Sequence, residues 1–306
     1  MTDSNRTRRG FLREGSAALV WGCAVGQSEK VEHVEARTAM GRIRGVRDRG
    51  VCFFRGIPYA GPVAGANRFK PAPAVEPWTG VRDALGLGAP SWQPGKTYYG
   101  VNEPSPDENC LVLNIWTPEV DGRRRPVMFY NHGGGFTTGS GGGRSQDGAN
   151  LARTYDVVAV ATNHRLGLLG YLYLGELGGE EYAGSGNQGL LDMRDGLKWV
   201  HNNIEAFGGD PGNVMIFGES GGGAKTSCLY ALPSAASYFN KASIESGPGI
   251  RMTPREVAAE TALLMLKELG LEKSEWRKLL DVPVEKLVAA QVALGRAPGR
   301  ATGGPS

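Results

Sequence analysis

The sequence predicts an α/β fold, with a layered and mostly parallel central sheet that has helices on both faces. Short runs rich in β-branched and aromatic residues alternate with segments whose apolar residues have helical spacing. Several of these runs are apolar throughout, as expected for strands that are covered on both faces. With 306 residues, 41% of them hydrophobic and 21% charged, the chain is long and apolar enough to bury a sizeable core.

Seven runs have the composition of strands. In chain order they are GRIRGV (41–46), VCFF (51–54), LVLNIW (111–116), PVMFYN (126–131), VVAVATN (157–163), VMIFG (214–218) and ASIES (242–246).

Three helices are expected among these strands. The clearest precedes VMIFG, where apolar residues recur every three or four positions from Leu190 to Phe207. Another begins at TPRE and ends at Gly270, with Thr253 as N-cap, Pro254 in the first turn and Glu256 completing a capping box. A third follows Ser274. The sequence contains no internal repeats.

The N-terminus resembles a twin-arginine export signal. The opening TRRGFLREGSAALVWGCAVG pairs two arginines with an apolar stretch, residues 15–25, that is shorter than the roughly 20 residues of a membrane-spanning helix. Cleavage after Gly26 would make residues 1–26 a signal peptide for export to the periplasm or the exterior; the alternative is a frayed basic N-terminus. Because VWGC has a bulky tryptophan, it is a poor lipoprotein box, and anchoring at Cys23 is not expected. No stable membrane span is expected elsewhere.

One domain, residues 27–294, follows the signal, and residues 295–306 (GRAPGRATGGPS) are expected to form a loose tail. Residues 1–26 contain four arginines against one aspartate and one glutamate, and the remainder is nearly neutral, which argues against a nucleic-acid partner. The other cysteines, Cys52, Cys110 and Cys228, are too widely spaced for a disulfide framework or metal site, so we expect free, buried thiols. The sequence implies no metal or organic cofactor.

The stretch FGESGGG, directly after an apolar run, contains a G-x-S-x-G pattern centred on Ser220. On a sharp turn between strand and helix this pattern holds the serine at strained backbone angles, with its hydroxyl clear of the sheet. In a chain with 47 glycines the pattern can also arise in an ordinary glycine-rich turn. The flanking sequence has to decide between the two interpretations.

A second informative stretch is PVMFYNHGGGF, a buried strand that runs into His132 and three glycines. Acyl transfer develops negative charge on a carbonyl oxygen, which backbone N–H groups can stabilise if no side chain blocks their approach. A phosphate-binding loop is the rival interpretation, but it would end in GK[ST], whereas Phe136 follows the glycines here. The HGGG loop therefore favours the pairing of oxyanion loop and nucleophile turn found in lipases and esterases.

FGGDPGNVMIFGESGG, residues 207–222, resembles the serine signature of the type-B carboxylesterases, the carboxylesterase and cholinesterase family. ENCLVLNIWTP, residues 108–118, is similar to the family's second signature, with Asn109 where an aspartate is usual and Val112 where an aromatic is common. The likeness continues in family order through FRGIPYA, NRFKPAP, PWTGVRDA, NHRLGLLGYL and GNQGLLDMRDGLKWVHNNI, over roughly residues 38–290. The resemblance implies an α/β-hydrolase fold and a serine carboxylic ester hydrolase that acts through an acyl-enzyme.

Carried over position by position, the resemblance makes Ser220 the nucleophile and Gly134, Gly135 and Gly221 the donors of the oxyanion hole. The residue at Gly221 is usually alanine in the family, and glycine there is expected to loosen the backbone. Glu219 would shape the electrostatics of the pocket.

The resemblance also implies two buried structural ion pairs, Arg68 with Glu108 and Arg165 with Asp192. His164 takes the place of the family's usual tyrosine.

The disulfide partner that animal members provide for Cys110 is replaced here by Ser91, in agreement with a free thiol.

A serine hydroxyl needs a histidine to accept its proton and a carboxylate to orient that histidine; in this fold both follow the serine along the chain. All four histidines precede Ser220: His33, His132, His164 and His201. We therefore expect the chain to resemble only the N-terminal part of the family. The C-terminal strands would be lacking, and ASIES would form an unprotected sheet edge.

The function predicted from sequence is a carboxylic ester hydrolase with a small-molecule ester substrate, inactive as this chain if the acid and histidine are absent. The main alternative is a non-catalytic, cholinesterase-like binding module or a truncated remnant, although adhesion requires neither the serine nor the glycine loop. A peptidase or lipase on the same sheet is a weaker alternative, because fold alone does not establish function. The sequence leaves the particular ester, the origin of the shortening and the oligomeric state open.

Overall fold

The computed structural model describes residues 31–95 and 103–296, which all belong to one compact unit, Val31–Ser306. The expected signal peptide, residues 1–26, lies outside the described residues, as does all of the expected tail except Gly295 and Arg296. Both remain predictions. In the described part of the chain, no helix is long and apolar enough to cross a membrane.

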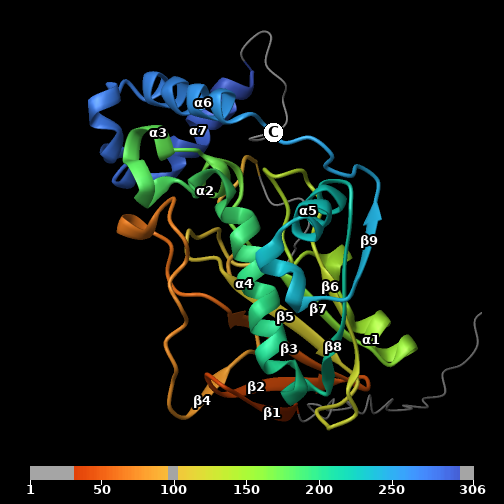
Figure 1. The fold of residues 1–306 in the computed structure, drawn as a ribbon. Helices are drawn as coiled ribbons and strands as arrows, with labels where there is room; N and C mark the ends of the chain where they lie inside the picture. The colour runs from red at the N-terminus through yellow and green to blue at the C-terminus, as the bar shows by residue number, and fades with distance from the viewer. Residues whose placement is uncertain (1–30, 96–102, 297–306) are drawn as a thin grey trace, which may run out of the picture. The chain divides into compact units, whose positions relative to one another are not determined.

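The described residues form one nine-stranded sheet (Figure 1), in the order β1-β2-β3-β5-β7-β6-β8-β9, with β4 paired to β2. The strands are β1 (Glu32–Thr38), β2 (Gly41–Asp48), β3 (Val51–Pro58), β4 (Val81–Asp83), β5 (Val112–Thr117), β6 (Arg125–Tyr130), β7 (Val158–Thr162), β8 (Gly209–Glu219) and β9 (Lys241–Glu245).

The sheet is mixed: neighbouring strands pair parallel in one part and mainly antiparallel in the other. From β7 through β6 and β8 to β9 all pairings are parallel, as predicted, whereas β1-β2-β3-β5-β7 pair antiparallel. Short connections cause the two antiparallel pairings at this edge, β1–β2 and β2–β3: Arg49 (φ 44°) and Gly50 (φ 74°), for example, form the two-residue turn of the β2–β3 hairpin.

All seven strands expected from the sequence are present, but β1 and β4 were not predicted. In β1 only Ala36 and Thr38 are buried, and the remaining positions, mostly charged or polar, are exposed or half-buried. An edge strand of this kind lacks the apolar pattern by which strands are found in a sequence.

Helices cover both faces of the sheet. The α-helices are α1 (Ala149–Tyr155), α2 (Gly167–Tyr171), α3 (Gly175–Gly178), α4 (Gln188–Asn203), α5 (Gly221–Tyr230), α6 (Arg255–Glu268) and α7 (Val284–Gly295). Short 3₁₀ helices are η1 (Gly65–Asn67), η2 (Arg144–Gln146), η3 (Gly179–Tyr182), η4 (Ser185–Asn187), η5 (Ile204–Phe207), η6 (Pro233–Tyr238) and η7 (Lys273–Leu280).

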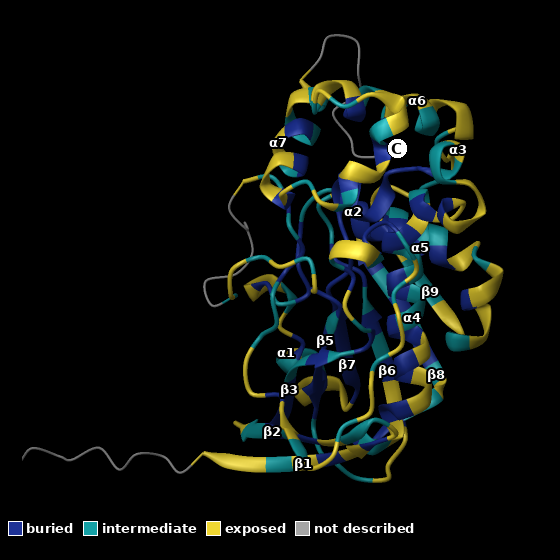
Figure 2. Cartoon of the chain, turned by 90° about the vertical axis from the view of Figure 1, so that its left-hand side faces the viewer, coloured by how far each residue is buried: buried dark blue, intermediate teal, exposed yellow. Residues whose placement is uncertain are grey.

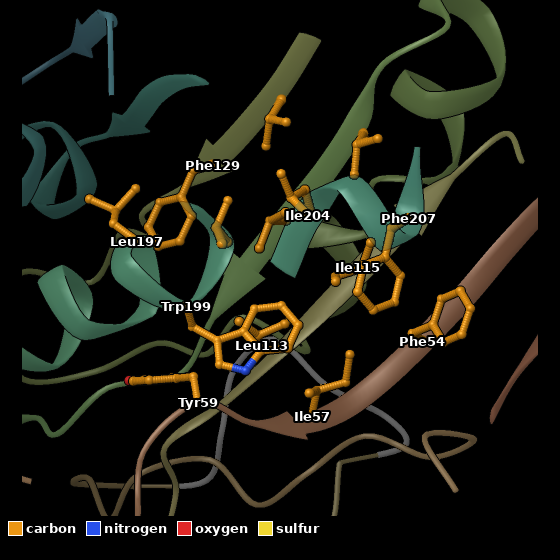
Figure 3. Close-up of a cluster of buried hydrophobic side chains, with 14 of the residues drawn as sticks. Phe54, Ile57, Tyr59, Leu113, Ile115, Phe129, Leu197, Trp199, Ile204 and Phe207 are labelled. Carbon is orange, nitrogen blue, oxygen red and sulfur yellow. The ribbon is translucent and has the colours of Figure 1, made fainter. Parts of the chain in front are cut away.

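The central strands are buried on both faces, as their apolar sequences predict (Figure 2). Leu113 and Ile115 of β5 pack with Leu197 of α4 in the larger cluster, part of which is drawn in Figure 3. The intervening side of the same strands contributes Trp116 and others to a smaller cluster with Ala152 of α1. Because successive side chains of a strand point to opposite faces of the sheet, one strand contributes residues to two separate hydrophobic clusters.

A third apolar cluster joins α2, α6 and α7, which lie together with α3 at one end of the sheet in Figures 1 and 2. The capping box expected for α6 from Thr253 and Glu256 is wrong. Pro254, not Thr253, is the N-cap of α6, and it makes no side-chain capping bond; the Thr253 hydroxyl is buried without a partner among the described residues. The helix expected after Ser274 is the 3₁₀ helix η7 followed by α7, because Pro283 separates the two and serves as the N-cap of α7.

Among the described residues, β9 pairs only with β8 and is therefore an edge strand, as expected for ASIES. Its Ile244 is 41% exposed, and several apolar residues that follow it are also exposed. This edge lies beside the loops from which the candidate site is built.

Candidate active site

The candidate site lies where the chain leaves two neighbouring parallel strands in opposite directions. β6 leads through α1 to β7 on one side, and β8 leads through α5 to β9 on the other. Right-handed crossovers then place α1 and α5 on opposite faces, which opens a crevice at the carboxyl ends of β6 and β8. The loop 131–135 and the turn 219–221 occupy these two strand ends, and the Asn131 amide still bonds to Phe217 O at 2.8 Å.

Ser220 forms the turn between β8 and α5. It is the N-cap residue of the helix, with φ 56° and ψ −123°, a strained conformation for a residue with a side chain, and it is exposed. Its amide donates to Glu245 O on β9 at 2.9 Å, which fixes the turn to the neighbouring strand. A Cβ atom at Gly218 or Gly222 would collide with Asn131 O, so only glycine allows this close approach of turn and loop.

The predicted oxyanion donors are the N–H groups of Gly134, Gly135 and Gly221, and none of them has a partner among the described residues. In a planar trans peptide the N–H points away from the preceding carbonyl. A bond to that carbonyl therefore fixes the direction in which the N–H points.

All three of these carbonyls are bound from behind. Gly133 O lies 2.9 Å from His132 Nδ1, Gly134 O accepts from the Thr138 amide at 3.1 Å and hydroxyl at 3.0 Å, and Ser220 O accepts from the Ala224 amide at 3.1 Å. The donors are thus oriented before any ligand arrives, which is what stabilisation of an oxyanion requires.

His132 is part of the loop's framework. Because its Nδ1 faces a carbonyl oxygen, which can only accept, Nδ1 must carry the proton. Burial, together with the positive charge of Lys225, holds the pKa of His132 well below its usual range, so the ring is neutral. Its ring stacks on that of His164, with centroids 4.5 Å apart. Burial, Lys225 and His132 in turn lower the pKa of His164.

None of the four histidines hydrogen-bonds to the Ser220 side chain in the described structure. His33 lies on β1, and the His201 ring lies against Tyr238. The serine therefore has no histidine base among these residues, in line with the order of residues along the chain.

Gly221, at the start of α5, packs directly against the oxyanion loop. A Cβ atom here would collide with the backbone N and Cα of Gly135. The glycine was expected to loosen the backbone here. Instead it allows a close backbone contact with Gly135 that the side chain of an alanine would disturb. Glu219 is exposed, and its carboxylate lies near Gly133, where a Cβ would be 3.9 Å from Oε2.

The two expected ion pairs are present. Arg165 donates from Nε and Nη2 to the two carboxylate oxygens of Asp192 at 2.9 and 2.7 Å, and both side chains are buried. Arg68 binds Glu108 at 2.7 and 2.5 Å and also donates to backbone carbonyls of Leu279 and Val282, which ties the C-terminal helices to the core.

Cys52 and Cys110 are free and buried, as expected, while Cys228 is free and half-buried. Burial raises the pKa of Cys110 to about 12, opposed in part by a hydrogen bond from Ser91. The serine that replaces the family's cysteine thus faces this thiol. No group of three or more His, Cys, Asp or Glu residues suited to a metal occurs in the described residues.

A cavity of about 940 Å³ adjoins the oxyanion loop. Its lining includes Phe136, directly after Gly135, Leu190 of α4, Cys228 of α5 and Met252 after β9. Ser220 does not line the cavity, which reaches the site through Phe136 at the end of the oxyanion loop and Cys228 of α5. Its largely apolar walls suit an apolar ligand group.

Sequence inspection missed Lys225 and Thr138. Lys225, in the second turn of α5, is fully buried. The available signal was a lone lysine in GGGAKTSCL, a helix start made otherwise of small and apolar residues.

A mixed sheet of this order, with a serine in a strand–turn–helix elbow, defines the α/β-hydrolase class. The chain belongs to the carboxylesterase family, whose sequence profile matches residues 31–301.

Two curated relatives illustrate this kinship. The chain is 40% identical over 260 residues to a para-nitrobenzyl esterase of Bacillus subtilis, covering 84% of this chain and 52% of that protein. It is 36% identical over 266 residues to a phenmedipham hydrolase of Pseudarthrobacter oxydans, covering 85% of this chain and again 52% of the other.

Among solved structures, a carboxylesterase of Geobacillus stearothermophilus superimposes with a TM-score of 0.82 at 41% identity, over 89% of this chain and 55% of that one. The chain thus spans about half the length of the relatives it matches.

Proposed function

We propose that this chain provides the nucleophile and oxyanion hole of a serine carboxylic ester hydrolase. The observation that supports this most is the strained, exposed Ser220 beside three N–H groups that have no partner among the described residues. The carbonyl that precedes each of them in its peptide is bound from behind. Membership of the carboxylesterase family agrees with it.

In the proposed reaction the Ser220 hydroxyl oxygen attacks the ester carbonyl carbon and loses its proton to a base. The carbonyl oxygen becomes an oxyanion that accepts hydrogen bonds from Gly134, Gly135 and Gly221. Collapse of this intermediate releases the alcohol and leaves an acyl-enzyme, which water hydrolyses by the same route.

The base and its carboxylate are the open part of this proposal. No histidine follows Ser220 in the 306 residues, and the relatives are about twice as long. We therefore expect this chain alone to react slowly; in serine hydrolases without a working triad, the oxyanion hole and binding leave about 10³–10⁴-fold acceleration over water.

Intact-mass analysis after incubation with a fluorophosphonate tests the proposal. We expect one adduct per chain that is lost in Ser220→Ala and retained in Ser227→Ala. Ser227 lies two turns along the same helix, and its hydroxyl donates to Gly223 O. An adduct that persists in Ser220→Ala would exclude this nucleophile. A folded, soluble chain that forms no adduct would show that it cannot activate the serine.

The substrate is proposed to be a small-molecule ester with an apolar group that fits the cavity beside Phe136. Export through residues 1–26 is also proposed, supported by the paired arginines and the short apolar stretch after them. The N-terminal mass of protein recovered outside the cytoplasm checks this, since cleavage should leave Gln27 first.

A further inference from the structure

Lys225 lies under the oxyanion loop, with its side chain fully buried. It belongs to α5, the helix that begins directly after Ser220, and its Nζ donates to the backbone carbonyl of His132 at 2.9 Å. The bond therefore links the helix of the nucleophile to the strand end that carries the loop. Burying an ammonium group is costly, so a lysine here calls for a physical reason.

No carboxylate of the described residues lies within ion-pair distance of Lys225. The titratable groups that face it are His132, after β6, and His164, after β7, and both are neutral because burial and the lysine charge lower their pKa. The other elements packed against α5, namely α4, η6, β8 and β9, bring no opposite charge to it. Burial alone lowers the pKa of Lys225 to about 7. Both the ammonium and the free amine are thus accessible near neutral pH.

The carbonyl that Lys225 binds is the first of three successive loop carbonyls held by side chains. Lys225 holds His132 O, the His132 ring holds Gly133 O, and Thr138 holds Gly134 O. The second and third of these peptides present the N–H groups of Gly134 and Gly135. His132 and Thr138 both belong to the loop segment itself, so among the three only Lys225 fixes the loop to the helix of Ser220.

We propose that Lys225 is a positioning residue that couples the protonation of one buried amine to the geometry of the oxyanion hole. This inference rests on the proposed function for the role of Gly134 and Gly135. The ammonium makes a charge-assisted bond to His132 O and adds positive potential behind the developing oxyanion. The free amine makes a weaker bond and adds no charge. The hole is therefore best ordered with Lys225 protonated, and it loosens as the pH rises above neutral.

The sequence permits a direct test, because His132–Gly133 is its only His–Gly pair. A chain labelled with ¹³C-carbonyl histidine and ¹⁵N glycine gives a single carbonyl–amide correlation in NMR, from the peptide that Lys225 binds. We expect the His132 carbonyl shift to titrate with a midpoint near pH 7 between pH 6 and 9. The midpoint should disappear in Lys225→Met, which keeps the length of the side chain without its charge. If that variant does not fold, Lys225→Gln replaces it, and the wild-type titration stands without either.

A carbonyl shift that is flat from pH 6 to 9, or one that titrates unchanged in the variants, would overturn the inference. His164→Phe, which removes the neighbouring ring and its two partnerless nitrogens, is the matched control and should leave a titration near neutral pH in place.

The rate of fluorophosphonate labelling then separates this inference from the proposed function. We expect the ratio of the wild-type rate to the Lys225→Met rate to fall about tenfold from pH 6 to pH 9, the size of one charge-assisted hydrogen bond. A constant ratio would overturn the coupling. A titrating carbonyl in a chain that is never labelled would leave the positioning role in place and count against the proposed function, whereas labelling with a flat carbonyl shift would do the reverse.

Discussion

Two buried cations near the candidate site are compensated in different ways. Arg165 binds both oxygens of Asp192 and also donates to Lys70 O at 2.7 Å, so its charge is balanced. Lys225 has one carbonyl partner and no counter-charge among the described residues. Burial lowers the pKa of both groups, but the Asp192 carboxylate more than reverses this for Arg165, whose pKa is raised.

The charge of Arg165 is therefore permanent, whereas that of Lys225 can change with pH. A guanidinium stays protonated at every accessible pH, so its burial requires a carboxylate, and the pair then holds the segment after β7 against α4. An amine can release its proton instead, so it can be buried without a carboxylate and can respond to pH. Loss of the counter-charge should therefore be costly at Arg165, whereas Lys225 should make stability depend on pH.

The largest effect is expected when the compensated cation loses its partner. Asp192→Asn leaves the buried guanidinium without a counter-charge and should lower the free energy of unfolding by about 3–5 kcal/mol. Urea denaturation at pH 7 measures this. The double variant Asp192→Leu with Arg165→Met, which removes both charges, should recover most of the loss. A single variant as stable as the wild type would show that the pair is not what holds this segment.

A smaller, pH-dependent effect is expected at Lys225. Its pKa is about 7 in the folded chain and about 10.5 when unfolded, so between these values the unfolded state binds more protons and stability rises with pH. The wild type should therefore gain about 2 kcal/mol relative to Lys225→Met between pH 7 and pH 9.

Paired urea titrations of the two proteins at these pH values isolate the lysine, because all other groups titrate in both. A difference that does not change with pH would mean that the lysine keeps its ordinary pKa and is hydrated in solution.

Some features of the fold could be predicted from the sequence and others could not. Alternation of apolar runs and helical spacing predicts the α/β class and seven strands, because burial on both faces leaves a strong pattern. The edge strand β1 was missed because only two of its residues are buried, and the antiparallel half because pairing direction depends on connections. Thr253 was expected to cap α6, but Pro254 is the N-cap.

For the site, Ser220 and the glycines can be found from sequence, since each answers a local backbone requirement that only certain residues meet. The carbonyls that orient the donors are held by side chains of His132 and Thr138, whose roles depend on the loop conformation. A lysine in a helix is normally on the surface, so the only sequence signal for Lys225 is the small and apolar residues around it in GGGAKTSCL, and that signal does not identify its partner.

The smallest effect is expected where a carboxylate pairs with arginines at the surface. Glu35 on β1 lies 3.4 Å from Arg42 and 3.8 Å from Arg44, and these side chains are 37–56% exposed. Glu35→Gln is the same carboxylate-to-amide change as Asp192→Asn, but water can solvate the arginines that remain, so it should cost less than about 1 kcal/mol. In 1 M salt, where the screening length is about 3 Å, the loss of unfolding free energy caused by Glu35→Gln should vanish. The loss caused by Asp192→Asn should persist. A cost at Glu35 equal to that at Asp192, unchanged by salt, would mean that burial is not what makes the inner pair matter.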